Sequence, residues 1–220
     1  MAKVLKFFFI FTKKSGHSSK NPVRQFNRRE KPLITNSMQD NSVEDISKAR
    51  PVLEFLTVAN EYCLFFERAD NFSTGDILGY FQKMAPLLYL KGCTLPLVEV
   101  TDASFNERFV TEEQWEEVFK TLREKFGADD VFFHLDHNAD SVEASLSDKL
   151  ADIYQDMKDF VLLFQKNHQY AKECAVAEIL ALLPGRWGPA LIHALNACHH
   201  LLYRDLIDPD LLDQDGIDFD

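Results

Sequence analysis

Apolar residues recur every three or four positions through most of the chain from residue 51 onward, which is the spacing of one helix face. The first repeat predicts a helix that begins at Pro51. The N–H groups of the first helical turn have no acceptor within the helix, so a proline there costs no hydrogen bond. A second repeat, over residues 77–88, predicts another helix, which we expect Pro86 to kink. Gly92, Pro96 and the unpatterned acidic run that follows predict a loop to residue 106.

Two later helices carry clear boundary or face signals. Thr111 and Gln114 have the spacing of a capping box, and Gly127 offers a stop in the left-handed conformation. After about residue 146 the most regular repeat of the chain predicts a long helix with an apolar face and a separate face of aspartates. Its apolar positions are Leu146, Leu150, Ile153, Tyr154, Met157, Phe160, Val161 and Phe164.

Two further helices are predicted over residues 170–183 and 189–204, separated at Pro184-Gly185. Residues 128–141 are expected to form a loop, and no run alternates with period two for long enough to predict a strand. The chain has 220 residues, 46% of them apolar, but only eight glycines and eight prolines, too few for a sandwich of short strands. We therefore predict an all-α fold: a single-domain bundle of about six helices.

Charge divides the chain near residue 38. Residues 1–37 hold nine lysines or arginines and one acid, whereas the remaining residues hold 15 basic and 34 acidic side chains. We predict that Met38 is the true start and that residues 1–37 are a non-native extension or a disordered basic tail. A basic arm for membranes or nucleic acid is the alternative. Residues 38–205 are then the helical domain, and residues 206–220 an acidic C-terminal tail.

The acidic body is not expected to bind nucleic acid, because it repels phosphate groups. The apolar run at residues 7–11 is too short to cross a bilayer and no cleavage site follows it, so we expect no transmembrane segment and no signal peptide. Four cysteines lie far apart without a C-x-x-C pair, which in a chain of this size indicates reduced structural cysteines. Together these features favour a cytoplasmic protein.

Several segments together resemble one family. They are VLEFLTVANEYCLFFE (52–67), FQKMAPLLYLKG (81–92), FVTEEQW (109–115), LADIYQDMKDFVLLFQ (150–165) and RWGPALIHAL (186–195). The family comprises uncharacterised bacterial all-helical proteins described as a domain of unknown function, DUF5063. The resemblance covers about residues 52–203 and implies a helical fold and a bacterial cytoplasm. It supplies no activity and no functional residue.

The best metal candidate is the run His134-Leu135-Asp136-His137, because imidazole and carboxylate groups within a few residues can hold zinc or manganese. The same residue types also serve turn geometry in a solvated polar loop, and the sequence favours that simpler interpretation.

A second metal candidate is the row Asp148, Asp152 and Asp156, which are one helical turn apart. Opposite a carboxylate or histidine of another helix, these side chains could bind a divalent ion. Most charged rows on helices are solvated, so the sequence favours an exposed acidic face. No cofactor is expected beyond such a divalent metal.

Arg186 and Trp187 form a candidate binding pair at the junction of the last two predicted helices. The arginine could contact an anion, although the sequence favours a tryptophan that anchors a tight turn. The chain has no nucleophile elbow, zinc-protease motif, P-loop or dinucleotide fingerprint.

We therefore expect a helical protein-interaction module, an adaptor or regulator whose partner is another protein. The alternative is a metal-dependent hydrolase that uses the bundle carboxylates and the His134–His137 loop. A pocket for a small ligand among the phenylalanines is a third option, and the oligomeric state stays open.

Overall fold

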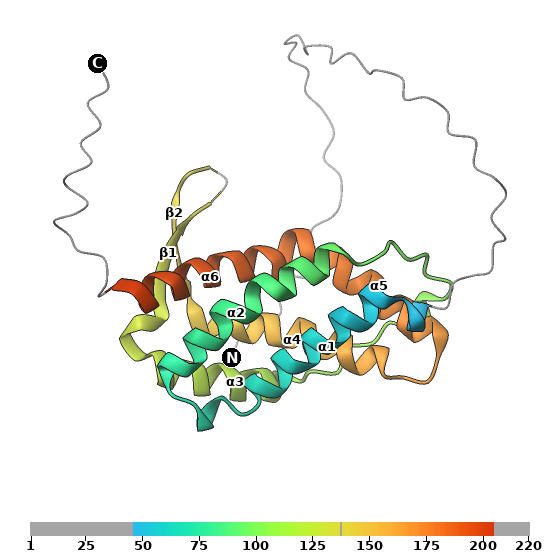
Figure 1. The fold of residues 1–220 in the computed structure, drawn as a ribbon, viewed down its shortest axis with the longest axis horizontal. Helices are drawn as coiled ribbons and strands as arrows, with labels where there is room; N and C mark the ends of the chain where they lie inside the picture. The colour runs from blue at the N-terminus through green and yellow to red at the C-terminus, as the bar shows by residue number, and fades with distance from the viewer. Residues whose placement is uncertain (1–45, 137, 205–220) are drawn as a thin grey trace, which may run out of the picture. The chain divides into compact units, whose positions relative to one another are not determined.

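The computed structural model describes residues 46–136 and 138–204, which all lie in the second of the two units of the chain, Ser42–Asp220. The predicted N-terminal extension and the acidic C-terminal tail fall outside these residues, as does His137. The helices are α1 (Arg50–Phe66), α2 (Thr74–Cys93), α3 (Glu112–Phe126), α4 (Leu146–Phe164), α5 (Gln169–Leu182) and α6 (Gly188–Tyr203) (Figure 1).

Helix α4 is the centre of the bundle, since it packs against α1, α3, α5 and α6 (Figure 1). Helix α2 packs against α1 and α6 and so closes the bundle on another side. The apolar face predicted for α4 is buried along its length. The hydroxyl of Tyr62 on α1 donates to the carbonyl of Leu150 on α4 at 3.0 Å, and Phe55 meets Phe160 edge-on at 5.0 Å. The mostly helical fold predicted from the apolar repeats is confirmed.

The predicted capping box of α3 is confirmed, and Gly127 follows the helix as predicted, although its ψ of −118° differs from that of the predicted left-handed conformation. The Thr111 hydroxyl accepts from the backbone N–H of Gln114, and the Gln114 side chain accepts from the backbone N–H of Thr111. Gly127 follows the helix with a φ of 54°, a conformation that is open to glycine because it has no Cβ. Helix α2 runs on to Cys93, so Gly92 lies in its last turn and not in the predicted loop.

The prediction that residues 128–141 form a loop without strands is wrong. Strands β1 (Val131–Leu135) and β2 (Ser141–Ser145) pair in an antiparallel hairpin that projects from the bundle beside α6 (Figure 1). The exposure of β1 alternates along the strand, but its hydrophobicity does not, because Phe132 on the partly buried face is as apolar as Val131 and Phe133 on the exposed one. A test for alternating polarity therefore misses it.

The predicted break between the last two helices is also wrong. Residues 183–187 form one π-helical turn, so α5 and α6 join into a single helical stretch, Gln169–Tyr203, of 35 residues. The bundle in the described residues is thus made of five helical stretches where about six helices were predicted, apart from short 3₁₀ turns.

The π-helical turn accommodates Pro184, which has no N–H to donate to the carbonyl of the preceding turn. The N–H of Leu183 donates to Leu180, which leaves the carbonyl of Ile179 for the indole N–H of Trp187 at 2.8 Å. The N–H of Gly188 then donates to the carbonyl of Leu183, five residues earlier. A Cβ atom on Gly188 would lie 2.2 Å from that carbonyl oxygen, so the turn requires glycine there.

By length and composition alone, the stretch Gln169–Tyr203 could cross a membrane: its most apolar part has a mean hydropathy of 1.3, and 39% of that part is buried. This is weak support for a membrane span, because the core helix of a soluble protein passes the same test. Here α5 packs against α4, and α6 packs against α2 and α4. We therefore interpret the stretch as a core helix of the bundle.

Candidate functional site

The aspartate row of α4 runs from a solvated end to a buried one. The side chain of Asp148 is 42% exposed and lies 3.9 Å from Lys149. Asp152 is half-buried and accepts from the indole N–H of Trp115 at 3.2 Å. Asp156 is buried, with 2% of its surface exposed. The expectation of an exposed acidic face is therefore wrong at Asp156, because two arginines from other segments cover it.

Arg108 is the first of these arginines, and it lies in the segment that leads into α3. Its Nη1 lies 3.4 Å from Asp156 Oδ1 and 3.2 Å from Asp159 Oδ2, both on α4. Its Nη2 donates to Glu178 on α5 at 2.9 Å. One guanidinium group thus joins three carboxylates from two helices.

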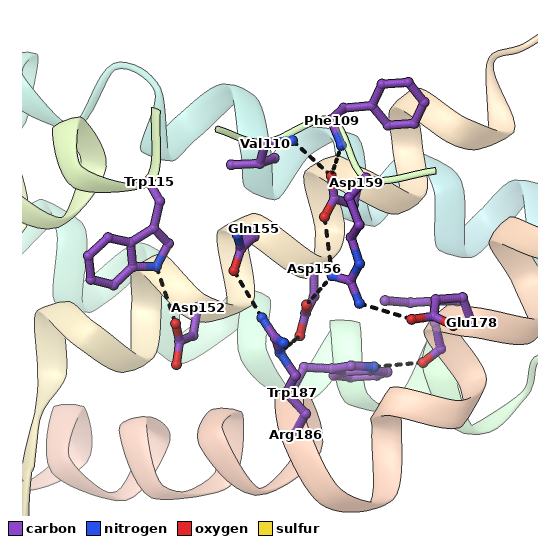
Figure 2. Close-up of polar contacts among 12 residues, drawn as sticks. Phe109, Val110, Trp115, Asp152, Gln155, Asp156, Asp159, Glu178, Arg186 and Trp187 are labelled. Atoms are coloured by element: carbon purple, nitrogen blue, oxygen red, sulfur yellow. Dashed lines mark hydrogen bonds and ion pairs between the residues drawn. The ribbon is translucent and has the colours of Figure 1, made fainter. Parts of the chain in front are cut away.

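Arg186, in the π-helical turn, reaches Asp156 from another direction (Figure 2). Its Nε lies 2.9 Å from Asp156 Oδ2, and its Nη2 donates to Gln155 Oε1 at 2.9 Å. This contact is an ion pair without hydrogen-bond geometry, and no described residue donates a hydrogen bond to Oδ2. Burial raises the pKa of Asp156 to about 6, although Arg186 and Arg108 act to lower it.

Asp159 fixes the segment that leads into α3. Its Oδ1 accepts from the backbone N–H groups of Phe109 at 2.7 Å and Val110 at 2.9 Å (Figure 2). These two amides precede α3 and have no helical partner of their own there. The carboxylate therefore joins the start of α3 to the middle of α4, and we assign it a structural role.

This arrangement weighs against a divalent metal at Asp156. The side chain faces two guanidinium groups instead of the glutamate or histidine that the metal hypothesis requires. A cation entering there would be repelled by both arginines and would have to displace them. The anion that Arg186 contacts is this internal carboxylate, and Trp187 is fully buried beside it (Figure 2).

Two described residues of the first metal candidate, His134 and Asp136, lie on the hairpin. Asp136 begins the turn, and its carboxylate accepts from the backbone N–H groups of Asn138 at 2.8 Å and Asp140 at 3.0 Å. His134 stacks on His193 of α6 with ring centroids 3.9 Å apart. Within the described residues no three His, Cys, Asp or Glu side chains are placed to hold a metal. Since His137 lies outside them, the metal site at this loop stays a prediction.

The hairpin carries a second candidate site, a surface that the sequence analysis missed. Val131, Phe133 and Leu135 of β1 are 47%, 62% and 65% exposed, and Ile192 of α6 is 49% exposed. We call these four residues the hairpin surface. Phe133, Leu135 and Ile192 line a hollow of about 440 Å³ between the hairpin and α6, together with His134, Ser141, His193 and Asn196. The run Val131-Phe132-Phe133 before an Asp- and Asn-rich turn was the available signal.

A polar network holds the base of the hairpin. Asp130 is buried, and its carboxylate accepts from the hydroxyl of Ser145 at 2.7 Å and the N–H of Ser147 at 2.7 Å. Arg123 of α3 lies 3.5 Å from the same carboxylate, and Arg204 contacts Asp129 at 2.7 Å. The hairpin is thus attached to α3 and α4 at its base and to α6 through the histidine stack.

Comparison with known proteins identifies a family and a similar structure. The model of the family described as "Domain of unknown function (DUF5063)" matches residues 47–204. The crystal structure of protein BF1032 from Bacteroides fragilis is similar, with 32% sequence identity and a TM-score of 0.66 over 72% of this chain and 96% of that one. No significant match was found among the curated proteins compared. The chain therefore belongs to the DUF5063 family.

Proposed function

We propose that this protein is a helical interaction module, an adaptor or regulator that binds another protein through the hairpin surface. The observation that carries the proposal is the exposed apolar row of Val131, Phe133 and Leu135 on a strand that projects from the bundle (Figure 1). Large apolar side chains grouped in this way mark interaction sites more often than single exposed leucines do.

The energetics of the hairpin support this function. An isolated two-stranded hairpin is marginally stable in water. This one is held at its base by Asp130 and on one face by the stack of His134 on His193. These contacts keep the strands in place while Phe133 and Leu135 stay accessible, so a partner meets a surface that is already formed.

Other exposed apolar residues are weaker candidates for a protein-binding site. Leu87, Leu90 and Leu97 are 40%, 58% and 92% exposed, but they lie on α2 and the following loop, where the backbone is helical or irregular. The hairpin adds strand edges, at which backbone groups are available to a partner.

The metal-dependent hydrolase is the weaker proposal. Its α4 carboxylates would have to be released from Arg108 and Arg186 before they could bind a metal or act on a substrate. The proposed interaction module needs no such rearrangement. We place it in the bacterial cytoplasm, in line with the bacterial source of BF1032, with a protein and not a nucleic acid as its partner.

The test compares Phe133→Asp with the matched control Leu90→Asp, since the two parent side chains are similarly exposed. Each variant and the wild type are purified from the native cells at the natural level, and stoichiometric co-purifying protein is quantified. We expect wild type and Leu90→Asp to retain the same partner and Phe133→Asp to lose it. A partner kept equally by all three, or no partner with any, would contradict the proposal.

A further inference from the structure

We infer that the hairpin surface takes an extended segment of another protein with alternating apolar and basic residues, which adds to β1 as a third strand. This inference rests on the proposed function and specifies the chemistry of the partner. It follows from the hydrogen-bond pattern of the hairpin and from the charges around it.

The turn of the hairpin fixes which backbone groups of β1 point away from β2. The N–H of Asp136 donates to the carbonyl of Asp140 at 2.9 Å, and the N–H of Ala139 donates to Asp136 at 3.0 Å. Ala139 has a φ of 65°, which is typical of the last residue in a three-residue hairpin loop. Asp136 and Asp140 are therefore a hydrogen-bonded pair of the ladder.

Hydrogen-bonded and non-hydrogen-bonded pairs alternate in an antiparallel ladder. With the register His134↔Val142 and Phe132↔Ala144, those two pairs are the next bonded ones. The N–H and C=O groups of Val131, Phe133 and Leu135 then point to the free edge of β1. The same three residues present the exposed apolar side chains, so one added strand could use both.

The charges near this edge favour a basic partner. Residues 131–145 include Asp136, Asp140 and Glu143 and contain no lysine or arginine. Glu143 is paired directly with Phe133, so its carboxylate shares the face of the apolar row. Lysines or arginines that alternate with the apolar residues of an incoming strand would point to the other face of the sheet, that of Asp136 and Asp140. Glu143 would attract them across β1, from about 10 Å away.

The same charges weigh against other occupants. A second copy would bring another hairpin with the same three acids against the first, which costs free energy. Phosphate groups of nucleic acids or anionic lipids would be repelled for the same reason.

The probes are three peptides: one of alternating lysine and valine, one of alternating glutamate and valine, and the lysine peptide with its central valine replaced by proline. Amide hydrogen exchange is measured in the full-length chain. The lysine peptide should slow exchange at Phe133 and Leu135 at least about tenfold, because these N–H groups gain partners. The glutamate and proline peptides should not, and raised salt should weaken the effect.

Charge reversal provides a second readout. Glu143→Lys should lower the affinity for the lysine peptide several-fold, whereas Glu124→Lys, an exposed control on α3, should leave it unchanged. Equal binding of the lysine and glutamate peptides, or binding without slowed exchange at Phe133 and Leu135, would overturn the inference. So would a wild-type dimer in sedimentation that Phe133→Asp abolishes.

The two proposals can fail separately. If Phe133→Asp loses its native partner while the lysine peptide leaves the β1 amides unprotected, the interaction function holds and strand addition does not. If Phe133→Asp keeps its native partner, both proposals fail.

Discussion

Gly92 and Trp187 lie so close together that a Cβ atom on Gly92 would be 2.3 Å from Cη2 and 2.9 Å from Cζ2 of the indole ring. The glycine, in the last turn of α2, leaves the space that the tryptophan of the π-helical turn fills. Trp187 is fully buried there, and its ring centroid lies 6.0 Å from that of Phe55 on α1. This contact joins α2 to the α5–α6 stretch.

Gly92→Ala should therefore destabilise the protein by about 1–3 kcal/mol, because a rigid, buried ring cannot move away from the added methyl group. Gly79→Ala in the same helix is the matched control, since nothing lies within 4 Å of its added Cβ. That change should stabilise the protein by up to about 1 kcal/mol through helix propensity. Urea unfolding of both variants measures the difference, and equal effects would refute the close contact.

Trp187→Phe should cost about 2–4 kcal/mol, because it leaves a void and deprives the buried carbonyl of Ile179 of its donor. Trp115→Phe is the comparison: its indole is only half-buried and donates to Asp152, so about 1 kcal/mol is expected. Thermal unfolding followed by circular dichroism ranks the two variants. A smaller loss at Trp187 than at Trp115 would contradict its role as the anchor of the π-helical turn.

Asp156→Asn should change the pH dependence of stability. Burial raises the pKa of Asp156 from an ordinary value of 3.8 to about 6, so between these values the folded state holds a proton that the unfolded state has lost. Wild type should then gain stability over Asp156→Asn as pH falls from about 6 to 4, by about 1.4 kcal/mol per pH unit. Urea unfolding across this range measures it, and a difference that shrinks on acidification would show that the arginines dominate.

Asp159→Ala should free the segment before α3, because it removes the acceptor of the Phe109 and Val110 amides and one partner of Arg108. We expect a loss of about 2–4 kcal/mol, and amide exchange at Phe109 and Val110 faster by at least about tenfold. Asp148→Ala on the same helix should cost less than about 1 kcal/mol, since that carboxylate is solvated. Unchanged exchange at both amides would refute the structural role.

Local signals in the sequence predicted much of the fold. The apolar repeats located the helices because the residues on the buried face of a helix recur about every 3.6 positions, and this spacing is visible in the sequence itself. The caps at Thr111 and Gly127 were predictable because each depends on residues within one turn of itself. The family resemblance was also carried by local segments, and the match to the DUF5063 family over residues 47–204 confirms it.

Tertiary structure decided the features that depend on residues far apart. Asp156 looked like part of a solvated row, and only the fold brings Arg108 and Arg186 to it. Pro184 predicted a break, but the indole of Trp187 and the space at Gly92 allow the helix to continue. The hairpin was not predicted because β1 carries apolar residues on both faces: Phe132 beside His134, which packs against α6, and the exposed row of Val131, Phe133 and Leu135. Such pairings are set by packing across the molecule, which the order of residues along the chain does not display.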